Sequence, residues 1–343
     1  MKRKSSKKTS QDEEISTGTG TARENGPLPE PDGSDKGGAK GIHRSNKLND
    51  LTGREWITFT RSWFVHNPAP RSRLQIRHPA KYPENLIAEF INFFTKKGDT
   101  VLDPFMGVGS TLLAASMTDR KAVGIELQKK YFRIAEEETA LKGSAFTLIN
   151  DDAAALRQIW SSRGLQSADF IITSPPYWDM LRQSRGHVFS THKRRHAEGL
   201  DVVYSEDDGR DIGNCTDYDQ FCGALVSIFR QAHQILREGR YLVIIVQNLR
   251  SAEGRMITLA WDLARQLDPP FTFKGERIWC QDNKKLGIWG YPSEFVSNVH
   301  HHYCLIFKKE AGSTSADEAA PLSPAKEKSP RNRGGSHRKR SED

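Results

Sequence analysis

The 343-residue chain contains few cysteines and no long apolar run. Its four cysteines, Cys215, Cys222, Cys280 and Cys304, show neither a CxxC spacing nor a zinc-ligand pattern, so we expect reduced thiols and no metal site. No run of about 18 apolar residues occurs, which argues against a transmembrane helix and membrane partners. The basic N-terminus lacks the apolar segment of a secretory signal, so the sequence predicts a cytoplasmic protein.

Two segments lack the aromatic and large aliphatic residues that a core requires. Residues 1–50 and 311–343 are rich in charged and small residues, so burial cannot offset their ordering entropy and we predict disorder. These tails could contact nucleic acid or only raise solubility. Between them, residues 51–310 are enough for one α/β domain. The net charge of +8 and the pI of about 9.2 suit a polyanionic partner.

Three consecutive histidines, His300 to His302, suggest a metal site at first sight. They open a strand-like run, in which neighbouring side chains point to opposite faces. Because three such side chains cannot all bind one ion, we interpret these histidines as structural.

The rest of the chain alternates between strand-like and helical patterns. Helices are predicted at 83–97, 110–118, 128–141, 152–161, 217–237 and 254–267. Strands are predicted at 100–102, 121–125, 145–149, 169–173, 241–246, 272–280 and 301–308, the last two as a hairpin. This alternation indicates an α/β fold, with a mainly parallel sheet covered by helices on both faces.

A glycine-rich turn follows the first of these strands. Gly107 and Gly109 allow the backbone to approach a ligand closely at the carboxyl end of a strand, where open α/β sheets bind ligands. Leu112 occupies the place of the third small residue of a dinucleotide fingerprint, so we predict a nucleoside-cofactor loop instead. Glu126 ends the next strand, where an acid accepts hydrogen bonds from ribose hydroxyls, and Asp151 and Asp152 follow another strand. Each acid could instead cap a helix.

The sequence Thr173-Ser174-Pro175-Pro176-Tyr177 ends a further apolar strand. Two prolines fix the backbone and offer no N–H, so the carbonyls of Ser174 and Pro175 can face a ligand as fixed acceptors. An exocyclic amino group needs such acceptors, because they localise its lone pair, and Tyr177 offers a flat face for stacking. The pattern therefore predicts chemistry on the amino group of a base.

These stretches, together with the segment from Arg77 to Pro83, resemble the S-adenosylmethionine-dependent DNA methyltransferases of the cytosine-N4 and adenine-N6 family. The resemblance implies a class I, Rossmann-like methyltransferase sheet with an antiparallel terminal hairpin. Ser-Pro-Pro-Tyr is the version most often associated with cytosine N4 in this family. Here the glycine loop precedes the Ser-Pro-Pro-Tyr turn, a circularly permuted order relative to most relatives with the His-Pro-Ala segment.

The resemblance also implies roles for individual residues. Methyl transfer would use Ser174, Pro175, Pro176 and Tyr177. The cofactor, S-adenosylmethionine, would contact His78, Pro79, Asp103, Phe105, Gly107, Gly109, Glu126 and Asp152. The substrate would be double-stranded DNA with the target base flipped out. Restriction-modification is the commonest setting of such relatives, with a cognate restriction endonuclease as partner and the nucleoid as the place of action.

The segment 179–216 breaks the alternation and is rich in basic residues. Because it leaves directly from the predicted catalytic turn, we expect it to contact nucleic acid through Arg182, Arg185, Lys193, Arg194 and Arg195. A solvated insertion is the alternative. A second basic and aromatic stretch, 56–77, could contact DNA or supply core residues.

Three other functions stay open at this point. The same residues would serve adenine-N6 methylation, or an RNA guanine-N2 methyltransferase, although the added RNA-binding module of the latter is not evident. A catalytically silent DNA-binding subunit is the third. The absence of a Pro-Cys pair argues against cytosine-C5 methylation, which needs a cysteine nucleophile.

Overall fold

The structure is a computed structural model that describes residues 41–67, 82–140, 142, 145–176, 178, 209–251, 255–284, 286–288 and 291–312. Its described residues form one compact unit that begins at Gly41. Residues 41–50, expected within the N-terminal tail, are packed onto the domain. Asn49 is fully buried and its side-chain amide donates to the Phe93 carbonyl at 2.5 Å, so this part of the expected tail is ordered.

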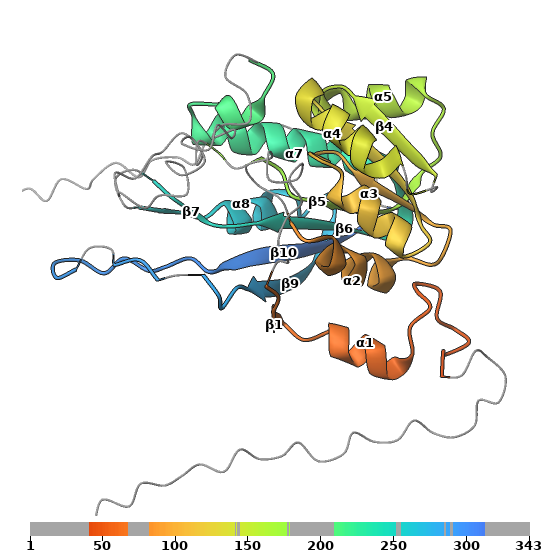
Figure 1. The fold of residues 1–343 in the computed structure, drawn as a ribbon, viewed down its shortest axis with the longest axis horizontal. Helices are drawn as coiled ribbons and strands as arrows, with labels where there is room; N and C mark the ends of the chain where they lie inside the picture. Colours follow the sequence, from red (N-terminus) through yellow and green to blue (C-terminus); the bar gives the residue numbers. More distant parts are fainter. Residues whose placement is uncertain are drawn as a thin grey trace, which may run out of the picture. The chain divides into compact units, whose positions relative to one another are not determined.

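Eight strands form one sheet, in the order β1-β9-β10-β6-β5-β2-β3-β4 (Figure 1). Their bounds are Trp63–Val65 (β1), Thr100–Asp103 (β2), Lys121–Glu126 (β3), Phe146–Asn150 (β4), Ala168–Thr173 (β5), Leu236–Val246 (β6), Thr272–Cys280 (β9) and His301–Lys308 (β10). β10 runs antiparallel to both of its neighbours, β6 and β9, and the other pairs are parallel. This order, with one reversed strand inserted near the end, is the class I methyltransferase sheet, and it confirms the predicted fold class and hairpin.

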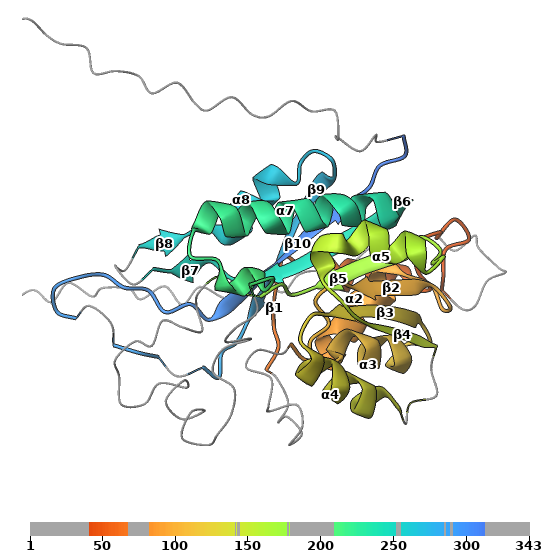
Figure 2. The ribbon, with the colours of Figure 1, turned by 90° about the horizontal axis from the view of Figure 1, so that it is seen from above.

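Helices cover both faces of the sheet (Figure 2). One face carries α2 (Glu84–Phe94), α3 (Ser110–Met117) and α4 (Lys129–Ala140), and the other carries α5 (Leu156–Ser162), α7 (Tyr218–Ile235) and α8 (Leu259–Gln266). The strands supply both layers by alternation: in β5, Phe170 and Ile172 join the core under α2, whereas Ile171 joins the core under α7. A strand buried on both faces therefore reads as a continuous apolar run.

The N-terminal part of the domain contains two elements that the apolar pattern did not reveal, α1 (Gly53–Phe59) and β1. α1 begins with a capping box, in which Glu55 accepts from the Thr52 amide at 2.8 Å and Thr52 accepts from the Glu55 amide. The buried guanidinium of Arg277 lies over the rings of Phe59 and Phe64, at 4.0 and 4.3 Å from their centroids. This contact ties α1 and β1 to β9.

The region after β6 also differs from the expectation. A short antiparallel pair, β7 (Leu249–Arg250) and β8 (Met256–Ile257), occupies the place where the predicted helix 254–267 would begin. α8 starts only at Leu259, after Thr258. The Asn248 side chain, just before β7, accepts from the Ala260 amide at 3.0 Å. It thus supplies a partner for one of the amides in the first turn of α8, which have none within the helix.

Candidate active site

The parallel strands end at one edge of the sheet, and four of them present the predicted site residues there. β2 ends at Asp103, β3 at Glu126, β4 at Asn150 and β5 at Thr173. β2 and β5 are direct neighbours, with Val101 paired to Phe170 and Leu102 to Ile171. Strand order reverses between β2 and β5, which is where open α/β sheets form a ligand crevice.

A buried hydrogen-bond network around Asp103 joins the glycine loop to the predicted catalytic turn. One carboxylate oxygen of Asp103 accepts from the Phe105 amide at 3.0 Å and from the Thr173 hydroxyl at 2.6 Å. The other accepts from the hydroxyls of Tyr82 at 2.6 Å and Thr111 at 2.5 Å. Residues from the segment before α2, from the glycine loop, from α3 and from the end of β5 thus donate to one carboxylate.

Burial and hydrogen bonding have opposite effects on this carboxylate. Asp103 is fully buried, and loss of hydration raises the pKa of its carboxyl, while the donors Thr111, Thr173 and Tyr82 lower it. Burial also raises the pKa of Tyr82 well above its usual range, so its hydroxyl stays protonated and acts as a donor. The network therefore fixes the end of β5, one residue before Ser174, relative to the start of the glycine loop.

The glycine loop adopts the backbone that its residues favour. Gly107 and Gly109 have φ of 53° and 88°, and Gly109 serves as the N-cap of α3 in the left-handed region. The loop lies close against β3, because the Met106 amide donates to the Ile125 carbonyl at 2.9 Å. A Cβ on Gly124 would lie 2.3 Å from the Met106 sulfur and 2.8 Å from a Leu112 methyl carbon, so a larger residue there would displace these side chains of the glycine loop and α3.

Glu126 is held in a fixed orientation beside this loop. Its two carboxylate oxygens accept from the amides of Gly107 at 3.0 Å and Gln128 at 2.7 Å. The pKa of Glu126 is raised to about 7. Burial is the largest cause, the charges of Asp211 and Asp103 add to it, and the two backbone donors act in the opposite direction. The carboxylate at the end of β3 is therefore poised to change charge near neutral pH.

Asp152, the residue expected near an adenine amino group, caps a short 3-10 helix at Ala153–Ala155. Its side chain accepts from the Ala154 amide at 2.8 Å. The neighbouring Asp151 accepts from the Asp152 amide at 2.9 Å and is exposed. Both acids lie at the same edge as Glu126, because the Asp151 amide donates to the Glu126 carbonyl.

The predicted catalytic turn follows β5 directly. Pro175 is buried, and Ser174 and Pro176 are half-buried. Trp178 packs against Tyr218 of α7 and donates from its indole N–H to the Cys215 carbonyl at 2.9 Å. Several predicted site residues lie outside the described part of the chain, namely His78, Pro79, Tyr177, Arg182, Arg185, Lys193, Arg194 and Arg195.

Four residues of this edge had no assigned role in the sequence reasoning: Tyr82, Thr111, Thr173 and Asp211. Three of them donate to Asp103 as described above. A sequence signal existed for Thr111 and Thr173, since hydroxyl side chains adjoin the glycine loop and the turn. Asp211 is buried and its side chain caps a short 3-10 helix at Ile212–Asn214, and nothing in the aperiodic segment around it points to its place near Glu126.

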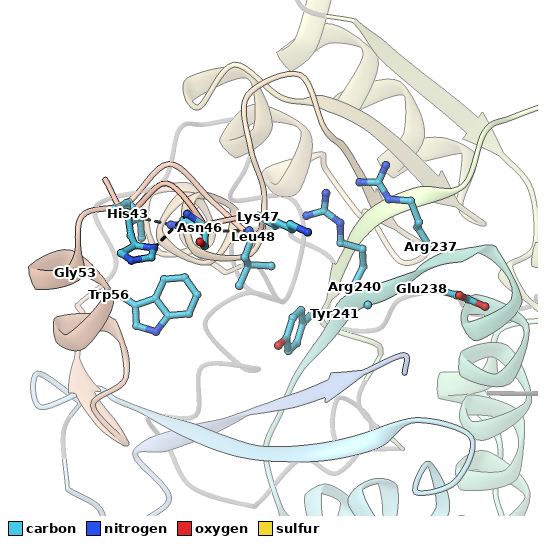
Figure 3. A pocket seen from close by; sticks show the side chains of 13 residues that line it. His43, Asn46, Lys47, Leu48, Gly53, Trp56, Arg237, Glu238, Arg240 and Tyr241 are labelled. Carbon is cyan, nitrogen blue, oxygen red and sulfur yellow. Dashed lines mark hydrogen bonds between the residues drawn. The ribbon is translucent and has the colours of Figure 1, made fainter. Parts of the chain in front are cut away.

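A cavity of about 710 Å³ lies at the opposite edge of the sheet (Figure 3). Trp56 and Tyr241 face it from different elements, and Arg237 and Arg240 project from the start of β6. Arg240 lies 3.3 Å from the Asp99 carboxylate, so its charge is compensated within the protein. This cavity is separate from the site described above, which lies at the carboxyl ends of the strands.

The histidines that open β10 make ring contacts within the domain. His302 stacks on Trp279 with ring centroids 4.3 Å apart, and His301 lies edge-on to Tyr303 at 5.1 Å. Burial lowers the pKa of His302 to about 3. All four cysteines are free. Within the described residues, no helix has the length and apolar composition needed to cross a membrane.

Sequence comparison with known proteins points to one kind of enzyme. Residues 5–137 match the family model for N6/N4 DNA methylases, described as DNA methylase. Over this stretch the chain resembles the N6/N4 DNA methylases. An orphan methyltransferase, M.BamHII of Bacillus amyloliquefaciens, is 39% identical to this chain over 98 residues, which are 28% of the chain and 35% of the relative. The type II methyltransferase M.BglII of Bacillus subtilis is 30% identical over 137 residues, 40% of the chain and 36% of the relative.

These relatives are matched over only part of their length. The type II methyltransferase M.BglI of Bacillus subtilis is 37% identical over 91 residues, 26% of this chain and 25% of the relative. The chain thus spans between a quarter and about a third of the curated methylases that it matches. Among solved structures, TrmN from Thermus thermophilus superposes with a TM-score of 0.40 at 17% identity, over 66% of this chain and 48% of that one.

S-adenosylmethionine is the cofactor that this resemblance implies, and the residues at the carboxyl edge fit it. The molecule offers hydrogen-bond donors on its ribose, its adenine amino group and its ammonium group. The edge offers the carboxylates of Glu126 and Asp152, and the glycine loop allows close approach of the backbone.

Proposed function

We propose that this chain transfers a methyl group from S-adenosylmethionine to the exocyclic amino group of a base in DNA, with N4 of cytosine as the target. The observation that carries the proposal is the bond from the Thr173 hydroxyl to Asp103. It joins the turn that would hold the amine to the loop that would hold the cofactor. Each loop alone is common in α/β proteins, whereas their direct connection suits a reaction between two bound groups.

The turn would act by accepting hydrogen bonds from the amino group. The Ser174 side chain and the Pro175 carbonyl would engage its two N–H bonds, which localises the nitrogen lone pair. Bound at the glycine loop, the cofactor supplies an electrophilic methyl group. Orientation and electrostatic fit would then account for most of the rate, and no covalent enzyme intermediate is required.

Residues that follow three strands, β2, β3 and β4, would each hold a different part of the cofactor. Phe105, Gly107 and Gly109 would surround the methionine part, Glu126 would accept from the ribose hydroxyls, and Asp152 would lie near the adenine amino group. His78 and Pro79 would wall the methionine pocket. Asp103 lies beneath this surface and would position the loop through its four hydrogen bonds.

The base and the biological setting are the finer parts of the proposal. Serine before the two prolines favours cytosine N4, and adenine N6 is the alternative, because the matched relatives are named as methyltransferases without their base. One relative is named as an orphan enzyme and others as type II enzymes, so both a restriction-modification pair with a cognate endonuclease and a solitary modification enzyme fit. Tyr177 would stack on the flipped base, and the basic residues of 179–216 would hold the flanking phosphates.

Digestion of treated DNA to nucleosides tests the base directly. DNA from a host that lacks such enzymes is incubated with the chain and methyl-labelled cofactor, and the nucleosides are separated. We expect label in N4-methylcytosine. Label in N6-methyladenine alone would replace the cytosine assignment. Label in RNA but not in DNA, when RNA is incubated in parallel, would remove DNA as the substrate.

Replacement of the turn's serine tests the mechanism. Ser174→Ala should lower methyl transfer by ~10²-fold, because one fixed acceptor is lost, while cofactor affinity measured by calorimetry changes little. Ser162→Ala makes the same change on the exposed end of α5, far from the site, and should behave as the unaltered protein. Loss of cofactor binding in Ser174→Ala would show that the turn is structural.

A further inference from the structure

The connection between β9 and β10 exposes a set of apolar side chains to water. Its described residues, 281–284, 286–288 and 291–300, are referred to below as the arm. Four of its side chains have the highest exposed fractions among the large apolar residues of the described chain: Leu286 (76%), Ile288 (82%), Tyr291 (82%) and Phe295 (89%). Scattered exposed apolar residues are ordinary, whereas four on one connection mark an interaction surface.

The arm leaves the sheet at the same edge as the candidate active site. β9 runs parallel to β6, because β10 is antiparallel to both, so the arm begins where the parallel strands end. Figures 1 and 2 both show it extending away from β9 and β10 on the side of β7. A bound duplex whose target base reached Ser174 would approach the protein from this edge.

The root of the arm is held by specific hydrogen bonds. Asn298 bridges its two sides, accepting from the Gly287 amide at 2.9 Å and donating to the Gly287 carbonyl at 3.0 Å. Arg250 of β7 donates to the Ser297 carbonyl at 2.9 Å. Asn67 donates to Asp282 at 2.6 Å. The apolar side chains are thus presented on a braced support, as a surface that contacts a partner requires.

Charges beside the arm favour a polyanionic partner. Lys284 lies on the arm itself, and the β7–β8 hairpin brings Arg250 and Arg255 next to its root. The arm also carries two acids, Asp282, which Asn67 engages, and the exposed Glu294 beside Phe295, so the basic groups lie mainly at its root and on the side of Lys284. Basic groups around protruding apolar side chains suit a nucleic-acid groove, where the cations contact phosphates and the apolar groups enter between bases.

We propose that the arm inserts Leu286 and Ile288 into a groove of duplex DNA and parts the base stack beside the target base. This inference rests on the proposed function, since it names the contact that would help to open the substrate duplex. Extrusion of a base costs unstacking and unpairing, and an apolar wedge offsets part of that cost. A single strand has no pair to open, so the arm should matter for duplex DNA and little for single strands.

The test compares the binding of duplex and single-stranded DNA of one sequence. Leu286→Ser with Ile288→Ser removes the wedge, and both side chains are exposed, so folding should be unaffected. Met117→Ser is the matched control, because Met117 is also an exposed apolar residue but ends α3 at the opposite edge. Fluorescence anisotropy of labelled DNA gives Kd without cofactor, so the result does not depend on methyl transfer.

We expect the double variant to raise the Kd for the duplex about tenfold or more, and that for the single strand less than about twofold. Met117→Ser should match the unaltered protein on both. Equal losses on the two DNA forms, or none, would overturn the wedge. A lower mass of the double variant than of the unaltered protein in sedimentation would also overturn it, because the arm would then be a contact between two copies of the chain. Incorporation of labelled methyl by the unaltered protein is measured separately and decides the proposed function.

Discussion

Removal of the hydrogen bond between Thr173 and Asp103 should weaken both folding and catalysis. Thr173→Val keeps the shape of the side chain and deletes only the donor, which lies 2.6 Å from a buried carboxylate. A hydrogen bond to a charged group contributes about 1.5–3 kcal/mol, so the free energy of unfolding should fall by that amount. For a domain of this size the melting temperature should drop by about 3–12 °C.

The catalytic consequence should exceed the loss of stability. Ser174 follows Thr173 directly, so release of β5's last residue frees the turn to shift relative to the glycine loop. A misplacement of the reacting groups by about 1 Å can cost up to ~10²-fold in rate. We therefore expect methyl transfer to fall about tenfold or more at a temperature at which the variant remains folded, with cofactor affinity less affected.

Urea unfolding and single-turnover methyl transfer measure the two effects. Thr118→Val is the matched control, because Thr118 is buried and its hydroxyl donates at 2.9 Å to the neutral Ala114 carbonyl, at the other edge of the sheet. It should lose only about 0.5–1.5 kcal/mol and retain the full rate. If Thr173→Val lost no more stability than Thr118→Val and transferred methyl groups normally, the reasoning about the Asp103 network would be wrong.

Two further predictions concern the cofactor side of the site. The pKa of Glu126 is raised to about 7, so its ionised form, which accepts from ribose hydroxyls, is lost as the pH falls through 7; cofactor Kd should rise progressively from about pH 8 to about pH 6, and Glu126→Gln should abolish this component. A pH dependence unchanged in that variant would assign the titration elsewhere. Gly124→Ala should destabilise the domain by about 1–3 kcal/mol and weaken cofactor binding, because the new methyl group would displace Met106 and the glycine loop. Gly223→Ala, on the exposed side of α7 with open space around its Cβ, should instead be neutral or stabilising in the same unfolding measurement.

The strands and helices of the core followed from the sequence because their patterns are continuous and strong. α2 shows the helical spacing of Leu86, Phe90 and Phe94, and it ends at Phe94 where Thr95 becomes extended, slightly before the predicted end. β5 and the second half of β6, residues 242–246, are buried and apolar on both faces, as strands in the middle of a covered sheet are. The hairpin of β9 and β10 was likewise predicted and is confirmed.

Elements at the margin of the fold were less visible, because tertiary contacts create them. β1 is three residues long and largely exposed, and it pairs with β9 across more than two hundred residues of chain. The contact that secures it, Arg277 among Phe59 and Phe64, joins a cation to aromatic residues from distant segments. Local periodicity contains no trace of such a contact.

The candidate site divides in the same way. Acids at strand ends could be predicted, since a parallel sheet collects its carboxyl ends at one edge, and Glu126 lies beside the glycine loop as that rule requires. The inward role of Asp103 could not, because nothing in its local sequence shows that Tyr82 and Thr173 reach it. The structure thus separates two acids that the sequence treated alike: Glu126 lies at the surface of the crevice, and Asp103 lies beneath it.

Chain order and site geometry are independent in this fold. The site depends on β2 being next to β5, and that adjacency is set by the sheet order and by the register of Val101 with Phe170. It does not depend on which of the two strands the chain forms first. The network at Asp103 adds a second constraint that is equally indifferent to order, because the Tyr82 and Thr173 hydroxyls reach it from opposite directions along the sequence. A permuted arrangement, with the glycine loop before the Ser-Pro-Pro-Tyr turn, can therefore build the same crevice. Permutation changes only where the connecting segments lie, and the arm between β9 and β10 leaves the sheet at the same edge as the crevice.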